Sequence, residues 1–256
     1  MRSFLTVAVF TTAWAGHVHA GQLVLWDFQT VTAGGAPPQA TIQEGLSTHG
    51  IWFNGFDDGG ASYAKGVMFH NNKGNHGKNR DYSENNNLGI YFDLIIAAGE
   101  PIDLTGLQTP WFWERPGGKG NNIEVFTQWQ YSITDSSGNS LVTWADIGGE
   151  EKMPYDNASG GFTGYYGMTT LDFSNIDALQ GLEDVTVTFR LLLWGGEHNA
   201  RAYLGKDAKL TPPGLDYFPN SLIIFGGPSV PEPSAMAFLV LSGATLLLRR
   251  RTRRTT

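Results

Sequence analysis

Residues Asp184–Trp194 read DVTVTFRLLLW, the clearest indication of secondary structure in the chain. Val185, Val187 and Phe189 alternate with threonines, so an extended chain here has one apolar and one polar face. Valine, threonine and phenylalanine are also the residue types that fit a pleated sheet best. We therefore predict a β-strand over these residues.

Apolar or alternating runs of this kind recur on both sides of that stretch, bounded by Gly, Asn, Asp and Pro. The segment Thr134–Asn139 (TDSSGN) has the chemistry of a hairpin loop, and a helical turn is expected only near Asn175–Leu182. Many short strands with almost no helix predict an all-β fold, a single β-sandwich or jelly-roll domain over residues 21–227. The further strands are expected at Gln22–Phe28, Gly50–Phe56, Lys65–His70, Leu88–Ile96, Asn122–Thr134, Ser140–Ala145, Phe162–Phe173, Ala200–Leu204 and Ser221–Phe225.

Composition limits the function. The 256 residues include 33 glycines, only 16% charged residues and no cysteine, so a packed core or bound ions must hold the fold without disulfides. Residues 21–228 contain 11 Lys and Arg against 23 Asp and Glu, a net charge of −12. Phosphate contacts need a basic face, so nucleic acid is not an expected partner.

The N-terminus has the three parts of a secretory signal peptide. Arg2 supplies the positive charge, Phe4–Ala15 is a short apolar run, and Val18 and Ala20 are small residues at the −3 and −1 positions. We expect residues 1–20 to direct export through the Sec translocon and to be removed by signal peptidase before Gly21.

The stretch Gly226–Ser229 (GGPS) is expected to be a linker between the domain and the C-terminal segment. This segment, residues 228–256, also has three parts. An extended motif comes first, then the apolar run Ala235–Leu248, and last an arginine cluster. Prolines on both sides of a glutamate prevent a regular helix, whereas the run that follows is nearly long enough to cross a bilayer as one. The cluster should remain cytoplasmic as a stop. The motif is Val230, Pro231, Glu232 and Pro233, and the cluster is Arg249, Arg250, Arg251, Arg253 and Arg254.

This order of motif, apolar helix and basic tip resembles the PEP-CTERM sorting signal of Gram-negative bacteria that make exopolysaccharide. The match is residue for residue at Pro231, Glu232 and Pro233. The resemblance implies an exosortase as partner, transient anchoring in the inner membrane by the C-terminal helix, and delivery to the cell surface or extracellular matrix. The same segment also bears an ice-binding label in some classifications, which describes the tail and says nothing of ice.

The segment from Leu171 to Gly195 is similar to the closing half of many PEP-CTERM ectodomains, where a short turn precedes a strand of the form VTFRL…WG. Those ectodomains resemble carbohydrate-binding jelly rolls or lectin-like sandwiches. An Asp-Asn pair often occurs on their last strand. Here Pro219 and Asn220 stand in its place, so the implied calcium ligand is missing.

Catalytic motifs are absent from the sequence: there is no HExxH, no GxSxG, no phosphate-binding loop and no cysteine nucleophile. Glu150 and Glu151 are adjacent and would point to opposite faces of a strand. We therefore expect no enzyme, no cofactor and no metal site. The Asn-rich stretch His70–Asp81 is interpreted as a surface loop, and Asp57–Gly60 as an ordinary turn. Two alternatives stay open, a metal or sugar site in that loop and a structural calcium ion held by the turn.

Aromatic residues give the main candidates for ligand binding. Trp111 and Trp113 fall on one face of an extended chain, and Tyr131 lies on the next predicted strand. Such rings can stack on sugars, but they can equally fill the core. Trp26, Trp144 and Trp194 lie in apolar strand contexts and are expected in the core.

These features predict an exported, non-enzymatic protein with a structural or adhesive role. A carbohydrate-binding module is the first alternative, and it requires exposed aromatics. A polysaccharide-acting hydrolase is the second, and it requires two carboxylates within about 10 Å of each other.

Overall fold

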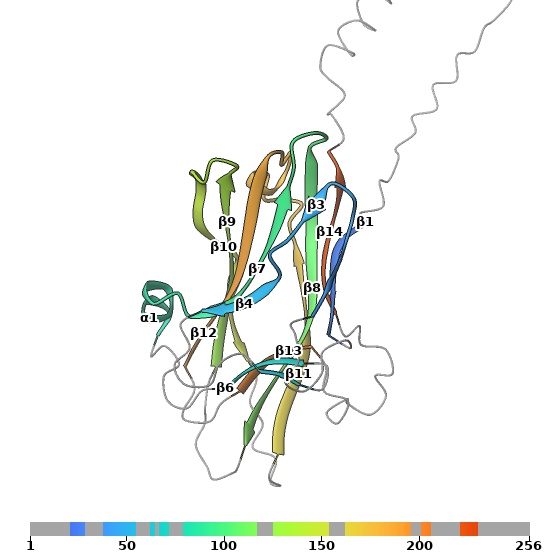
Figure 1. Ribbon diagram of the computed structural model, residues 1–256. Coiled ribbons are helices and arrows are strands. Elements are labelled where there is room, and N and C mark those ends of the chain that lie inside the picture. The colour runs from blue at the N-terminus through green and yellow to red at the C-terminus, as the bar shows by residue number, and fades with distance from the viewer. Residues whose placement is uncertain are drawn as a thin grey trace, which may run out of the picture.

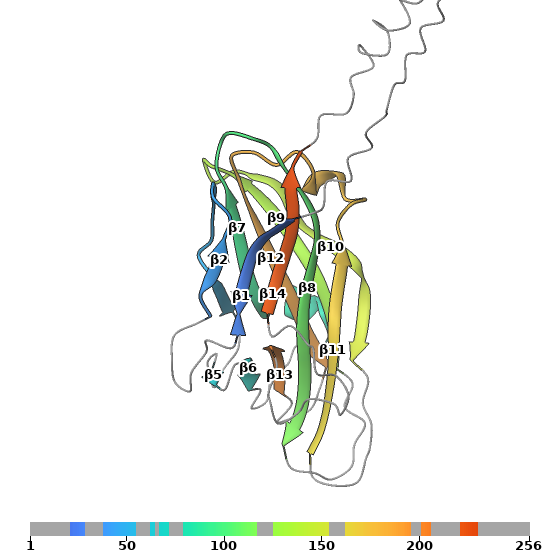
Figure 2. The same ribbon diagram turned by 90° about the vertical axis from the view of Figure 1, so that its right-hand side faces the viewer.

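Two antiparallel β-sheets make up the computed structural model of the chain, which describes residues 21–28, 38–54, 62–64, 67–71, 79–116, 125–153, 162–195, 201–205 and 221–229. Figure 1 and Figure 2 show the two sheets lying face to face. The predicted all-β sandwich is confirmed.

The first sheet has eight strands, with seven in the order β2-β1-β14-β8-β13-β6-β5 and β11 paired with β8. The long strand β8 is its centre, because β14 and β13 pair with successive parts of one edge while β11 pairs along the other. The strands are β1 (Gly21–Asp27), β2 (Ala40–Ile42), β5 (Ser62–Ala64), β6 (Val67–Asn71), β8 (Ile102–Pro116), β11 (Phe162–Asp172), β13 (Arg201–Gly205) and β14 (Ser221–Pro228).

The second sheet has six strands, with the order β10-β9-β12-β7-β3 and with β4 also paired with β7. Strand β12 (Val185–Gly195), which contains most of the stretch DVTVTFRLLLW, lies in the middle between β9 and β7. The other strands are β3 (Leu46–Ser47), β4 (Ile51–Asn54), β7 (Gly89–Ile96), β9 (Val125–Asp135) and β10 (Ser140–Met153).

The core lies between the inner faces of the two sheets. Phe189 of β12 is fully buried and stacks on Phe92 of β7 at 5.3 Å between ring centroids and on Phe173 at 5.5 Å. Trp26 of the opposite sheet meets Phe92 edge to face at 5.4 Å. The alternation read from the sequence therefore places Val187, Phe189 and their apolar neighbours inward, and leaves the intervening residues of β12 for the outer face.

Helices are short in the described residues. The expected helical turn is present as η2 (Asp177–Leu179), but α1 (Arg80–Asn85) was not predicted, because the stretch around it was interpreted as a surface loop. Neither helix in the described ranges is long and apolar enough to cross a membrane. In Figure 1, α1 lies outside the six-stranded sheet.

The expected hairpin loop joins β9 to β10. Asp135 accepts hydrogen bonds from the backbone amides of Ser137 and Asn139, and Gly138 takes a left-handed φ of 83°. The Asn139 side chain, followed by these amides, lowers the pKa of Asp135.

The glycine pair near the C-terminal end is not a linker, contrary to the sequence-based expectation. Gly226 and Gly227 continue β14 and pair with β8, and the backbone of Ser229 still donates to Pro101. A Cβ on Gly226 would meet the carbonyl oxygen of Asp103 at 2.4 Å, so glycine is required there for close strand approach rather than for flexibility.

Candidate functional site

Most residues singled out from the sequence lie outside the described residues or lack a described side chain. The signal peptide, the sorting motif, the arginine cluster and the Asp57–Gly60 turn fall outside the described residues. Trp111 and Trp113 lie on β8, opposite Gly167 and Tyr165 of β11, but their side chains are not described. These assignments stay predictions.

Tyr131 has a described side chain, and its position does not suit sugar binding. Its side chain is 6% exposed and belongs to the core cluster between the sheets. Burial also raises the pKa of its hydroxyl. A ring in the core offers no face to a sugar. The alternation of Trp129, Tyr131 and Ile133 already indicates an inward position.

A different set of side chains comes together on the outer face of the six-stranded sheet. Strand register places Trp52 of β4 opposite Tyr91 of β7, Tyr91 opposite Arg190 of β12, Arg190 opposite Gln130 of β9, and Gln130 opposite Asp146 of β10. We call these five residues the cross-sheet row. With strands about 4.8 Å apart, the row runs about 19 Å across five strands.

Arg190 is the centre of the row and is only 2% exposed. Its Nε donates to Oε1 of Gln130 at 2.7 Å, and its Nη1 donates to Oδ1 of Asn87 at 3.2 Å. The guanidinium lies over the ring of Trp144, 4.0 Å from the centroid. Among the described residues no carboxylate forms an ion pair with it. A buried cation without such a partner is costly, so its neutral neighbours must stabilise it.

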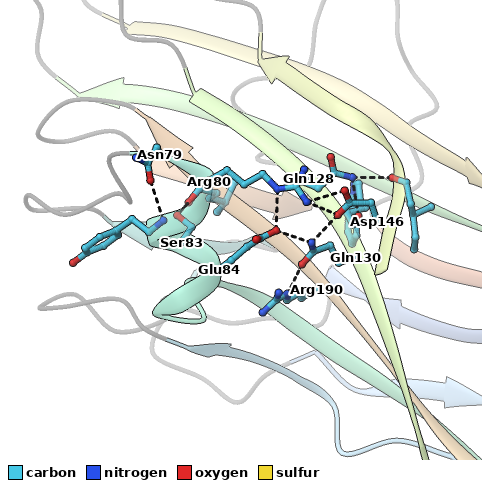
Figure 3. Close-up of polar contacts among 12 residues, drawn as sticks. Asn79, Arg80, Ser83, Glu84, Gln128, Gln130, Asp146 and Arg190 are labelled. Atoms are coloured by element: carbon cyan, nitrogen blue, oxygen red, sulfur yellow. Dashed lines mark hydrogen bonds and ion pairs between the residues drawn. The ribbon is translucent and has the colours of Figure 1, made fainter. Parts of the chain in front are cut away.

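Gln130 connects Arg190 to two carboxylates. Its amide nitrogen donates to Glu84 at 2.9 Å and to Asp146 at 2.7 Å, while its carbonyl oxygen accepts from Arg190 (Figure 3). The negative charge of both acids thus polarises the amide toward the buried guanidinium. The glutamine acts as a relay between charges that do not touch.

Arg80 closes the network from α1. Its Nε donates to Glu84 at 2.9 Å and its Nη2 to both oxygens of Asp146 at 2.7 Å. The hydrogen bond to Asp146, and after it the one to Glu84, raises the pKa of Arg80. In the cluster of Arg80, Glu84, Asp146 and Arg190, two positive and two negative charges balance.

The position of α1 follows from local contacts. Asn79 caps the helix by accepting from the amide of Tyr82 at 2.9 Å. The hydroxyl of the fully buried Ser83 donates to the carbonyl of Leu193 at 2.8 Å, which ties the helix to β12. Arg80 and Glu84 are then four residues apart on the face that meets the row.

Aromatic rings flank the network. Trp52 stacks on Tyr91 with centroids 5.8 Å apart and planes 16° apart, and Trp144 meets Tyr91 edge to face at 5.9 Å. Both tryptophans are half-buried, whereas Tyr91 is 5% exposed and its pKa is raised by burial. The row and the neighbouring Trp144 therefore combine two half-buried indole rings with carboxylate, amide and guanidinium groups.

The expectation that Trp144 fills the core is wrong, whereas Trp26 lies in the core as predicted. Trp194 is also buried, but it lies outside the core cluster, on the same face of β12 as Arg190, and stacks on Phe126. The register of β10 shifts between Val142 and Ala145, where a bulge inserts an extra residue. Val142 and Ala145 both pack against the core, so Trp144 is turned to the outer face.

Sequence reasoning missed the row, although part of its signal is visible. Gln130 alternates with core residues of β9, and Arg190 interrupts the apolar run of β12 between two core residues. A lone polar residue in an apolar strand marks the outer face. No local pattern shows that these two residues are neighbours on adjacent strands.

A second polar cluster lies near the end of the row that Trp52 forms. Asp93 of β7, 2% exposed, accepts from the hydroxyl of Thr48 at 2.9 Å and from the backbone amide of His49 at 2.7 Å, and also contacts the ring of His49. These contacts anchor the β3–β4 loop, and with it the strand that bears Trp52. No group of three potential metal ligands occurs among the described residues.

Comparisons with known proteins assign no family. No family model matches the chain, and no curated protein matches it. A solved carbohydrate-binding module specific for non-crystalline cellulose is 7% identical, over 72% of this chain and 88% of that one, with a TM-score of 0.33. A xylan-binding domain from Paenibacillus barcinonensis is 9% identical, over 82% and 97%, with a TM-score of 0.26. A CocE/NonD family hydrolase from Staphylococcus aureus is 9% identical, over 82% of this chain and 37% of that one, with a TM-score of 0.36.

Proposed function

We propose that this chain is an exported surface or matrix protein whose β-sandwich binds polysaccharide at the cross-sheet row. The observation that supports this is the row together with the neighbouring Trp144. Half-buried Trp144 lies over Arg190, whose partner Gln130 contacts Glu84 and Asp146. Half-buried Trp52 stacks on Tyr91 at the other end of the row. Indole rings stack on the C–H faces of sugars, and charged or amide groups satisfy their hydroxyls. The solved modules named above bind cellulose and xylan, but the proposal rests on the side chains of the row.

Binding fits the row better than hydrolysis. Glu84 and Asp146 contact the same amide nitrogen, so they lie within the separation that a glycosidase needs. Both are also committed to Arg80, which contacts them at 2.9 and 2.7 Å. A glycosidase needs one carboxyl to give its proton to the leaving group. In this arrangement both carboxylates instead serve as acceptors, which is the role that sugar hydroxyls require.

The ligand is expected to be a neutral chain of several sugars. The charges around the row cancel, whereas residues 21–228 carry a net charge of −12 from 11 basic and 23 acidic residues, which disfavours anionic chains. A row about 19 Å long, at about 4.8 Å per strand, exceeds the size of one sugar ring.

Isothermal titration with soluble cellulose-type, xylan-type and uronate-containing polysaccharides tests the proposal. Trp52→Ala and Trp144→Ala should each weaken binding of the preferred neutral chain by about tenfold or more, a change of about 1.4 kcal/mol. Leu141→Ala is the matched control, because Leu141 is 59% exposed on the same strand as Trp144. Unchanged affinity of both tryptophan variants would contradict a role of the row.

We also propose that the C-terminal segment sorts the protein. The order of Pro231-Glu232-Pro233, apolar run and arginine cluster supports recognition by an exosortase at the inner membrane of a Gram-negative cell. In such a host Glu232→Ala should leave the protein in the membrane fraction. Normal processing of that variant, measured by mass spectrometry of both termini, would argue against the sorting role.

A further inference from the structure

Edge strands expose unpaired backbone groups, and most edges of this sandwich are protected against pairing with another chain. Strands β2, β3, β4 and β5 contain only two to four residues each. Such short strands present few free N–H and C=O groups. Two long edge strands remain among the described elements, β10 and β11.

Strand β10 is long but irregular. Its pairing with β9 is interrupted by three register shifts, and its second half contains Glu150, Glu151 and Lys152. Bulges twist an edge away from a flat partner, and charges make its burial costly. This edge therefore resists the addition of a strand.

Strand β11 has neither form of protection. It pairs with β8 in an unbroken register from Phe162 opposite Pro116 to Asp172 opposite Gly106. Its sequence, FTGYYGMTTLD, contains no proline and no charge before Asp172. No described strand pairs with its other edge, and Figure 2 shows β11 beside β8 at the margin of the sheet. Since residues of an antiparallel strand bond alternately to the two sides, about half of its backbone groups point away from β8.

We propose that β11 pairs edge to edge with β11 of a second copy of this chain. Antiparallel pairing of a strand with itself is two-fold symmetric, so one surface serves both molecules. Charge favours this site over the rest of the surface, because two domains of net charge −12 (11 basic and 23 acidic residues over 21–228) repel, whereas β11 is uncharged from Phe162 to Leu171. The pairing would join the eight-stranded sheets of two copies and would not involve the other sheet, which contains the cross-sheet row.

Single-cysteine cross-linking in the full chain tests this pairing. The protein has no cysteine of its own, so each variant contains one thiol. Every residue from Gly164 to Thr170 is replaced in turn, and Thr143→Cys on β10 is the control on the protected edge. The position closest to the two-fold axis should give a yield of disulfide-linked dimer at least about tenfold above that of the control, because strand pairing raises the local thiol concentration there. The yield should fall on both sides of that position.

Sedimentation of the cysteine-free chain gives the second measurement. It should show a dimer that dissociates in the double variant Met168→Lys/Thr170→Lys, whose side chains lie on the partly exposed face of β11. A circular dichroism spectrum that matches the parent shows that this variant is folded. A monomeric parent, equal cross-linking at all positions, or cross-links only to other proteins would overturn the proposal.

Discussion

Replacement of Gln130 by leucine is the sharpest test of the relay. The side chain is 3% exposed, and leucine preserves much of its volume while it removes every hydrogen bond. Arg190 then loses the acceptor at 2.7 Å from its Nε in a site that is 2% exposed. A hydrogen bond to a buried charged group contributes about 1.5–3 kcal/mol. The lost hydrogen bonds to Glu84 and Asp146 add little to the loss of stability, because these acids are about a third exposed and still form ion pairs with Arg80.

We therefore expect Gln130→Leu to lower the free energy of unfolding by about 2–3 kcal/mol. With a urea m-value of about 2–3 kcal/mol/M, the midpoint should fall by about 1 M. Gln108→Leu, at a half-buried glutamine of β8 in the other sheet, is the matched control. Equilibrium urea denaturation followed by tryptophan fluorescence measures both variants.

The double variant Arg190→Met/Gln130→Leu decides whether charge is the cause. If the loss comes from a buried cation without its acceptor, removal of that cation should recover part of the stability lost in Gln130→Leu. The outcome that refutes the relay is additivity. In that case the double variant loses as much free energy of unfolding as the two single variants lose together, which shows that the two residues are not coupled.

Three further predictions concern the fold. Gly226→Ala should lower the free energy of unfolding by about 1–3 kcal/mol, because the new Cβ would lie 2.4 Å from the carbonyl oxygen of Asp103. Gly149→Ala is the control and should have no such effect, because no atom lies within 4 Å of its new Cβ. Thermal denaturation compares the two variants. Phe189→Ala should cost about 3–5 kcal/mol in urea denaturation, since it empties the centre of the core; a loss below about 1 kcal/mol would contradict its central position. Asp135 has a lowered pKa, so its contribution is present above the ordinary value of 3.8 and is lost as the pH falls through the folded-state value. Asp135→Asn should therefore lose less stability between pH 5 and pH 2 than the parent, and equal slopes in urea titrations would exclude this contribution.

The candidate site could be predicted only in part. Residue types on β9 and β12 place Gln130 and Arg190 away from the core, because the side-chain period of a strand is two. Other partners of these residues come from β7 and β10, and in the case of Asn87 and Glu84 from 103 and 46 residues away in sequence. Pairing register between distant strands is not encoded in any local pattern. Helix α1 was missed because one and a half turns of polar residues look like a loop.

Three features of the fold could be predicted from local sequence patterns: the all-β class, the inward-facing residues of β12 and the hairpin between β9 and β10. All three follow from backbone preferences and from the side-chain period of two in a strand. The sequence also contains the two terminal signals on which the proposed export and sorting rest. Three other features could not be predicted in this way: Trp144 leaves the core at a bulge, Gly226 belongs to a strand, and Arg190 is buried beside a glutamine instead of an acid. Each of them depends on contacts between segments distant in sequence, which form only when the sheets assemble.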